Sequence, residues 1–231
     1  MNRSDQEAAY QEVRLRVSDL VAQHPDRLDE LVPACPGWTA RQLVAHLAGL
    51  ARDLVDGNVD GWATEGWTAA HVKRFGSQSG VDLVAAWSGA AKDVADAADF
   101  GSVPAVAFAF GDAVVHEADL RPALEPGSRV PADSVIAALG AGVARWRAVL
   151  SSAALPALRL DVPGVRSWWL GDRADAGAVV VEASAYEAFR ALYGRRSKAQ
   201  VATWKWSGSA EPYIEAGLPF PFRWADSALV D

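Results

Sequence analysis

The sequence has a single cysteine, Cys35, among its 231 residues. One cysteine excludes a disulfide framework and a cysteine-rich metal site, and such low usage is typical of a reducing compartment. The chain also lacks any apolar run of the roughly 18 residues that a membrane span needs. Its N-terminal stretch, MNRSDQEAAYQEVR, is too polar for a signal peptide. We therefore expect a cytoplasmic protein that does not bind membranes.

Positive charge is scarce as well, since 22 Lys and Arg residues stand against 29 Asp and Glu residues, for a net charge of −7. No cluster of Lys and Arg interrupts this balance, so neither nucleic acid nor an anionic membrane is favoured as a partner. Glycine forms no GxGxxG motif after a strand, no P-loop and no GxSxG elbow. Nucleotide-dependent chemistry is therefore not expected.

The hydrophobic pattern predicts the fold class. Helical periodicity occupies the first two thirds of the chain and predicts helices at about 5–24, 39–56, 67–75, 81–97, 106–124 and 132–151. Beyond it, one helix at 186–193 is surrounded by short β-branched or apolar runs, which predict strands at 158–162, 167–170, 178–181 and 201–206. We therefore expect an α+β fold, with a mostly α bundle at 1–154 and a small α/β domain at 155–231.

The predicted helix at 39–56 has a complete set of start signals. Thr39 is a good N-cap residue, and Gln42 follows three residues later as in a capping box. Gly57 is placed to end the helix. The boundaries of this helix are therefore well defined by the sequence.

Three residues on two predicted helices have the spacing of a metal site. His46 lies in mid-helix, on or beside the apolar face. Asp112 and His116 are four residues apart, so a carboxylate and an imidazole lie side by side on one helix face. Two ligands at this spacing, with a third from a neighbouring helix, commonly build a zinc or nickel site inside a bundle. Such a set leaves one coordination position open, which is the catalytic pattern.

Each of these residues also has a structural interpretation. A mid-helix histidine is often a hydrogen-bonded core residue, and acid–histidine pairs arise by chance in so acidic a chain. His24 is interpreted as a helix end, and His71 as either a surface residue or a contact of the site. Cys35 precedes a helix N-terminus, where the helix dipole can lower the pKa of a thiol, so Cys35 is a candidate nucleophile. The alternative is a structural role, in a buried turn that brings Trp38 into the core.

The stretch CPGWTARQLVAHLAGLARD resembles the signature of the mycothiol-dependent maleylpyruvate isomerase family, whose N-terminal half is a DinB-like metal-binding four-helix bundle. The resemblance implies that His46 is the first metal ligand. The later stretch GDAVVHEADLRPAL resembles the family's second ligand helix, with Asp112 and His116 in the places of its Glu-x-x-x-His pair. Asp112 is one methylene shorter than the family's Glu, and Pro122 is expected to kink or end that helix early.

The stretch AFRALYGRRSKAQVATWKWSG is similar to the family's small second domain, in which a Gly-Arg step ends a helix. The family's active-site arginine corresponds to Arg195, with Arg196 as the alternative register. The resemblance implies that this residue binds a carboxylate of the substrate through two parallel hydrogen bonds. An acidic residue of the family falls at Asp119. It is expected to hold the second ring nitrogen of His46 or His116, or to pair with an arginine such as Arg52 or Arg121.

The resemblance further implies a divalent metal, zinc with nickel as the alternative, and mycothiol as the thiol cosubstrate. Metal coordination deprotonates a thiol that is otherwise mostly protonated at neutral pH. The thiolate then attacks a small electrophile, and the reaction is an isomerisation if the thiol leaves and an S-transfer if it stays. A metal-dependent hydrolase or lyase and a non-catalytic metal-binding protein remain as alternatives. Both a monomer and a homodimer are compatible with the sequence.

Overall fold

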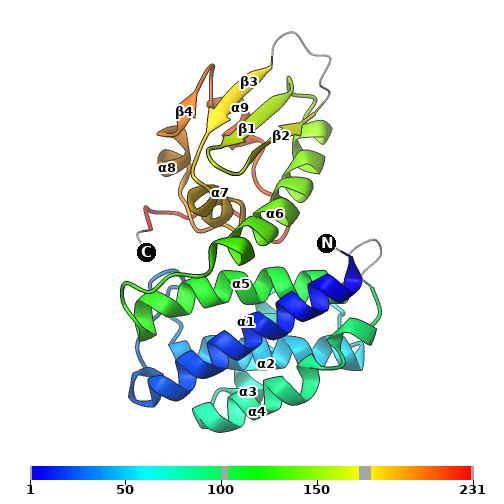
Figure 1. Ribbon diagram of the computed structural model, residues 1–231, viewed down its shortest axis with the longest axis vertical. Coiled ribbons are helices and arrows are strands. Elements are labelled where there is room, and N and C mark those ends of the chain that lie inside the picture. Colours follow the sequence, from blue (N-terminus) through cyan, green and yellow to red (C-terminus); the bar gives the residue numbers. More distant parts are fainter. Residues whose placement is uncertain (1, 100–103, 172–177, 230–231) are drawn as a thin grey trace. The chain divides into compact units, whose positions relative to one another are not determined.

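The computed structural model describes residues 2–99, 104–171 and 178–229, and the chain divides into two units between Val130 and Pro131. The first unit is a helical bundle, as Figure 1 shows. Its α-helices are α1 (Arg3–Gln23), α2 (Ala40–Asp56), α3 (Glu65–Phe75), α4 (Gly80–Ala91) and α5 (Ala105–Leu124). Short 3-10 turns lie at Pro25–Arg27 and Val94–Asp96.

Helix α2 is the central element of this bundle. It packs against α3, α4 and α5, while α1 packs along α5. Partners on several sides explain why every residue of α2 from Leu43 to Ala51 is buried. Side chains of α2 can therefore meet side chains of α3 and α5 away from bulk water.

The start and end of α2 are those that the sequence predicts. The Thr39 hydroxyl accepts from the Gln42 amide N–H, and the Gln42 side chain accepts from the Thr39 N–H, which completes the capping box. Gly57 follows the last helical residue with φ 72°, in the left-handed region that glycine adopts without strain. The capping signals therefore define where α2 begins and ends, with His46 in its middle.

The ends of two other predicted helices can be compared with the structure. Helix α5 continues past Pro122, which is expected to kink it or end it early, and it ends at Leu124, as its predicted range has it. Proline has a helical φ, and the Glu125 N–H still donates to the Arg121 carbonyl, so the last turn survives. The helix predicted at 81–97 ends at Ala91, and a 3-10 turn at Val94–Asp96 takes the place of its last turn.

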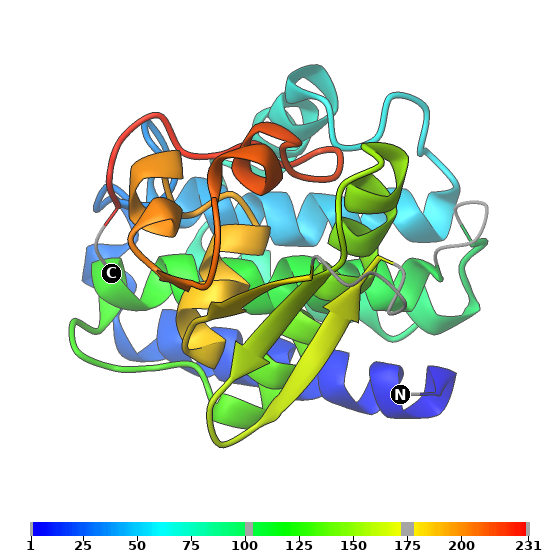
Figure 2. The same ribbon diagram turned by 90° about the horizontal axis from the view of Figure 1, so that it is seen from above.

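The second unit contains α6 (Ala132–Ser152) and a four-stranded sheet in the order β2-β1-β3-β4, as Figures 1 and 2 show. The strands are β1 (Leu158–Val162), β2 (Arg166–Leu170), β3 (Val179–Glu182) and β4 (Lys205–Trp206). Strand β1 is antiparallel to β2 and parallel to β3, and β4 is antiparallel to β3. The remaining helices of this unit's described residues are α7 (Ala185–Leu192), α8 (Lys198–Ala202) and α9 (Glu211–Glu215). The expected α+β class is confirmed.

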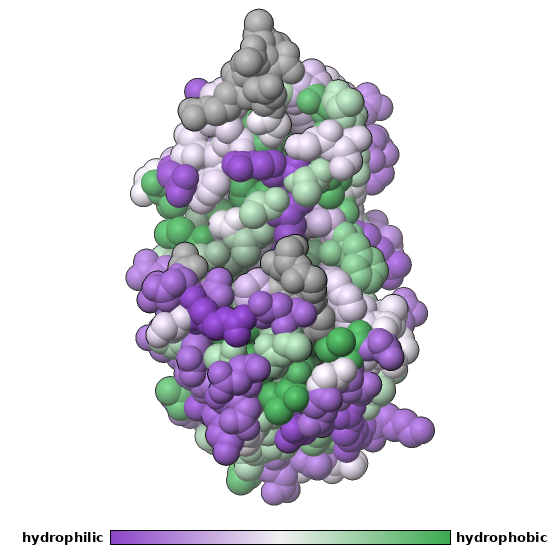
Figure 3. Space-filling model, turned by 90° about the vertical axis from the view of Figure 1, so that its right-hand side faces the viewer, coloured by the Kyte–Doolittle hydropathy of each residue, from purple (hydrophilic) through white to green (hydrophobic). Residues whose placement is uncertain are grey.

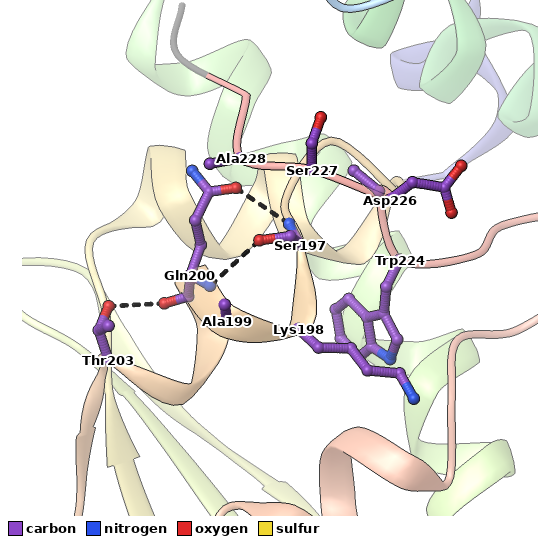
Figure 4. A pocket seen from close by; sticks show the side chains of 10 residues that line it. Ser197, Lys198, Ala199, Gln200, Thr203, Trp224, Asp226, Ser227 and Ala228 are labelled. Atoms are coloured by element: carbon purple, nitrogen blue, oxygen red, sulfur yellow. Dashed lines mark hydrogen bonds between the residues drawn. The ribbon is translucent and has the colours of Figure 1, made fainter.

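The apolar run at 201–206 is not one strand, as the sequence suggested. Ser197 and Gln200 form a capping box that starts α8, so Val201 is helical and only β4 remains extended. Figure 4 shows both hydrogen bonds of this box. A local side-chain cap therefore outweighs the β propensity of the first residues of the run.

Helix α6 packs against α7 and β2 and so groups with the second unit. The expected domain boundary at 154/155 follows the change from helical to strand patterns, whereas the two units divide at 130/131. Periodicity identifies α6 as a helix, but it carries no information about which partner its apolar face covers.

The surface mixes hydrophilic and apolar residues. On the face drawn in Figure 3, hydrophilic side chains cover much of the helical unit, with small separate apolar areas between them. Within the described residues, no helix is both long and apolar enough to cross a membrane.

Candidate metal centre

The candidate site lies in the helical unit, where α2 packs against α5. Helix α2 contributes His46, and α5 contributes Asp112 and His116 from two successive turns. One ligand atom from each of these residues can be chosen so that all three lie within 4.8 Å of one another. The structure therefore brings together the three residues that the sequence singled out as metal ligands.

The carboxylate of Asp112 stands between two imidazoles. Its Oδ2 lies 3.4 Å from His46 Nε2, and its Oδ1 lies 3.5 Å from His116 Nε2. The two rings are nearly perpendicular, with centroids 5.1 Å apart. Both Nε2 atoms thus face one carboxylate, which is the arrangement that a shared cation requires.

The other ring nitrogen of each imidazole is held by a separate group. His116 Nδ1 lies 3.0 Å from Asp119 Oδ2, and His46 Nδ1 lies 3.0 Å from the Nδ1 of His71. A carboxylate only accepts, so in the neutral ring of His116 the hydrogen is on Nδ1 and the lone pair is on Nε2. Of the partners considered for Asp119, His116 is therefore the one that the structure brings to it, while Arg52 and Arg121 pair with Asp56 and Glu117.

Burial and close contact shift the pKa values in this cluster. Burial alone would raise the pKa of Asp112, but the neighbouring imidazoles of His116 and His46 outweigh it and hold that pKa below its ordinary value. Burial alone would lower the pKa of His116, but Asp112 and Asp119 raise it well above its ordinary value. The metal-free cluster is thus a carboxylate beside a protonated imidazole, and a bound cation would displace that proton.

One oxygen atom of the cluster has no hydrogen-bond partner. Oδ2 of Asp112 is buried and makes no hydrogen bond, its nearest ring nitrogen being 3.4 Å away. A buried carboxylate oxygen without a partner is destabilising, and a cation bound by it removes that cost. Two imidazole nitrogens and one carboxylate oxygen are a common donor set of catalytic zinc sites. The residues present therefore fit a divalent cation.

Cys35 contacts the same cluster. Its half-buried thiol donates to Asp119 Oδ2 over 3.3 Å, so one carboxylate oxygen serves both the thiol and the His116 ring. Ligand atoms of Cys35, His116 and Asp119 also lie within 4.8 Å of one another. No local pattern indicates this contact, because the two partners are 84 residues apart in the chain.

His71 is fully buried, so its interpretation as a surface residue is wrong. Burial and the neighbouring His46 lower the pKa of His71 to about 4, and it is therefore neutral at physiological pH. Its Nε2 lies 2.9 Å from Oδ2 of Asp53, and the Trp67 ring packs against it with centroids 4.3 Å apart. Trp38 likewise packs edge-on against His46, with centroids 5.9 Å apart.

The remaining candidates lie outside this cluster. His24 is the C-cap residue of α1, as expected. Arg195 follows α7 in the second unit, and its Nη1 donates to the Tyr193 carbonyl. Arg196, the alternative register, is 3% exposed and binds both carboxylate oxygens of Glu187. Substrate binding by Arg195, with Arg196 as the alternative register, stays a prediction.

The second unit also has a surface cavity of about 690 Å³, which Figure 4 shows. Helix α8 and the segment at 224–228 line it, and none of the lining residues is a predicted site residue. Its polar groups are occupied mainly in local capping, as in the Ser197–Gln200 pair. The cavity therefore does not compete with the histidine cluster as a candidate site.

Comparisons with known proteins point to one family. Residues 10–121 match the family model described as the mycothiol maleylpyruvate isomerase N-terminal domain. The chain is similar to a crystal structure of a mycothiol-dependent maleylpyruvate isomerase, at 16% identity and a TM-score of 0.58, over 90% of this chain and 93% of that one. A histidine-to-alanine mutant of that isomerase gives 15% identity and a TM-score of 0.57, with the same coverage. Among curated proteins, no sequence matches this chain significantly.

Proposed function

This chain belongs to the mycothiol maleylpyruvate isomerase family by its N-terminal domain, and from this premise we propose that it is a metal-dependent enzyme acting with mycothiol. The proposed reaction is isomerisation of a small electrophilic substrate, or transfer of the thiol to it. The cation is zinc in this proposal, with nickel as the alternative. His46, Asp112 and His116 are its proposed ligands.

One observation carries the proposal. The two Nε2 atoms of His46 and His116 face the same partly buried carboxylate, while their Nδ1 atoms are engaged by other groups. In an imidazole that binds a metal, one ring nitrogen offers its lone pair to the cation and the other is hydrogen-bonded. A set of merely structural histidines would not need both rings to aim the same nitrogen at one point.

In this proposal the cation activates the thiol, and the residues of the chain bind the cation and the substrate. When bound, a divalent cation would lower the pKa of a thiol attached to it from its ordinary value of about 8.5, so that the thiol would be a thiolate at neutral pH. Three protein ligands leave a position for that thiol. Arg195, which has a planar guanidinium, is proposed to bind a carboxylate of the substrate through two parallel hydrogen bonds.

The two reaction types share their first half. The thiolate sulfur forms a bond to an electrophilic carbon of the substrate. In an isomerisation the former double bond rotates, the same carbon–sulfur bond breaks and the thiol is returned unchanged. In an S-transfer that bond remains and the thiol is consumed, while the electron pair displaced on the substrate takes up a proton or departs with a leaving group. Thiol consumption during turnover therefore separates the two.

Metal analysis of purified variants tests the ligand set. We expect about one equivalent of bound metal in the wild type, and loss of it in His46→Ala and in His116→Ala with the helical content unchanged. His24→Ala is the matched control, because His24 is a half-buried histidine at the end of α1, outside the cluster. Wild-type metal content in either cluster variant would contradict the assignment.

Turnover assays test the reaction class. We expect product formation from maleylpyruvate or another activated alkene to require both the metal and mycothiol. Product formed with metal but without thiol would instead indicate a hydrolase or lyase, in which the metal activates water. A protein purified without chelator that holds no metal would indicate a non-catalytic member of the family.

A further inference from the structure

Helix α2 has a glycine, Gly49, three residues after His46 and therefore on a neighbouring part of the same face. Glycine weakens a helix interior relative to alanine, so its presence in the middle of α2 needs a reason. A Cβ at this position would lie 2.5 Å from Cβ and 2.6 Å from Cγ of His71. The missing side chain is therefore what allows His71 of α3 to lie directly against α2.

His71 uses this close approach to contact a candidate metal ligand. Its Nδ1 lies 3.0 Å from Nδ1 of His46, and its Nε2 lies 2.9 Å from Oδ2 of Asp53. The side chains of His71 and Asp53 are 0% and 1% exposed, so water does not compete for these contacts. The contacts thus connect Asp53 of α2, His71 of α3 and the candidate ligand His46 of α2 in that order.

Arg74 fixes the direction of these hydrogen bonds. Its guanidinium donates to both carboxylate oxygens of Asp53, over 2.6 and 3.1 Å. Asp53 is therefore an anion that accepts from Nε2 of His71, which leaves the Nδ1 of His71 as an acceptor. That nitrogen accepts from Nδ1 of His46, so the lone pair of His46 is on Nε2, the atom that faces Asp112.

We propose that His71 is a positioning residue, which Gly49 admits beside α2 and which holds the ring of His46 in the tautomer and orientation that bind the metal. This inference rests on the proposed function, since it requires His46 to be a metal ligand. Hydrogen bonds to the far nitrogen of a ligand imidazole orient the ring and raise its affinity for the cation. Here the acceptor is a neutral histidine, whereas for His116 it is the carboxylate of Asp119.

Packing alone does not account for His71. An apolar ring of similar size would fill the space between Gly49 and Trp67 without bringing polar atoms into the core. The structure instead buries a histidine, a carboxylate and the guanidinium contacts that hold that carboxylate. Buried polar groups are retained at such a cost where their hydrogen bonds set the geometry of something else.

Metal affinity of three variants tests the inference. We expect His71→Leu, which removes the acceptor, and Gly49→Ala, which displaces His71, each to weaken Zn²⁺ binding by roughly 10- to 100-fold. His71→Asn is expected to recover part of the loss, because its Oδ1 occupies a place similar to that of the imidazole Nδ1. Gly66→Ala is the matched control, since Gly66 lies in the same helix as His71 and a Cβ there meets nothing within 4 Å.

The dissociation constant is measured by chelator competition on the metal-free protein, and the absorption spectrum of the Co²⁺ form reports the ligand geometry. We expect the Co²⁺ bands to change in His71→Leu and Gly49→Ala but not in Gly66→Ala. Thermal unfolding of each variant identifies any that is not folded. If His71→Leu does not fold, Gly49→Ala and His71→Asn carry the test.

Two outcomes separate this inference from the function on which it rests. If His46→Ala loses its metal while folded His71→Leu and Gly49→Ala bind Zn²⁺ within about twofold of the wild type, the inference is wrong and the metal site stands. If His46→Ala retains its metal, the proposed ligand set is wrong, and with it the role of His71.

Discussion

Two acidic residues of α5, the partly buried Asp112 and the fully buried Glu117, have opposite surroundings. Glu117 is fully buried and accepts from two guanidinium groups, those of Arg16 and Arg121. Asp112 faces only two imidazoles, and its Oδ2 makes no hydrogen bond. One helix thus carries a carboxylate whose charge is balanced within the protein, and another, five residues earlier, whose oxygen still lacks a partner.

The surroundings of Asp112 and Glu117 distinguish a structural ion cluster from a metal site. Two permanent cations neutralise Glu117, so nothing further is needed at that position. The imidazoles beside Asp112 are charged only when protonated, and a divalent cation can take the place of that proton. Both clusters place an acidic side chain beside basic ones, so that pairing alone does not distinguish them. The difference is that Glu117 is paired with arginines and Asp112 with histidines.

The largest effect is expected when the charge of Asp112 is removed. Asp112→Asn keeps the shape of the side chain but loses an anionic ligand, so metal affinity should fall by more than the roughly 100-fold seen for supporting residues. Added Zn²⁺ should raise the melting temperature of the wild type but not of this variant, because only a bound ligand stabilises the folded state. Equal Zn²⁺-dependent shifts in both proteins would contradict the comparison.

Glu117→Ala is expected to do the reverse, with a loss of stability and no loss of metal. The change leaves two guanidinium groups beside an empty buried space, and removing one partner of a buried ion pair costs about 3 kcal/mol. Chemical denaturation measures this change in the free energy of unfolding. Bound metal per folded molecule should equal that of the wild type, and a drop in it would show that the two clusters are coupled.

A smaller effect is expected at Asp119, which is hydrogen-bonded to Nδ1 of His116, the ring nitrogen that does not face Asp112. Asp119→Asn keeps an oxygen near Nδ1 of the ring but removes the charge, and metal affinity should fall by roughly 10- to 100-fold without unfolding. Chelator competition measures the dissociation constant. An unchanged value would make Asp119 a structural residue, closer in kind to Glu117 than to Asp112.

The smallest effect is expected at a glycine that has no neighbour to accommodate. A Cβ at Gly89 of α4 meets nothing within 4 Å, in contrast to Gly49. Gly89→Ala should therefore stabilise the protein by about 0.5–1 kcal/mol through helix propensity alone. Thermal unfolding measures the gain, and Zn²⁺ affinity should not change. A destabilised protein would mean that α4 needs this glycine for a reason other than space.

The sequence predicts best those features that depend on residues within one or two helical turns. The capping box of α2, the i, i+4 pair of Asp112 and His116, and the mid-helix place of His46 are all of this kind. The family resemblance added that these residues act together. Pro122 shows the limit of a local rule, since a proline near a helix end removes one hydrogen bond without stopping the helix.

Contacts between helices were beyond the reach of local patterns. Glu117 pairs with Arg16, 101 residues away, and Cys35 reaches Asp119 from a loop. Nothing in the chain between 57 and 79 distinguishes His71 from a surface histidine, because its burial depends on the absence of a side chain at Gly49 in another helix.

From the sequence alone follow the seven longer helices of the described residues, the class of the fold and the three residues that form the candidate metal site, but not α8 and α9. Periodicity, capping and the i, i+4 rule act over a few residues, so they can be read without knowing the partners. Which nitrogen of each histidine faces Asp112 follows only from the folded structure, because it depends on the hydrogen bonds of the rings with His71 and Asp119. Tautomer and ring orientation are set by neighbours in space, and their order in the chain does not encode which side chains become neighbours.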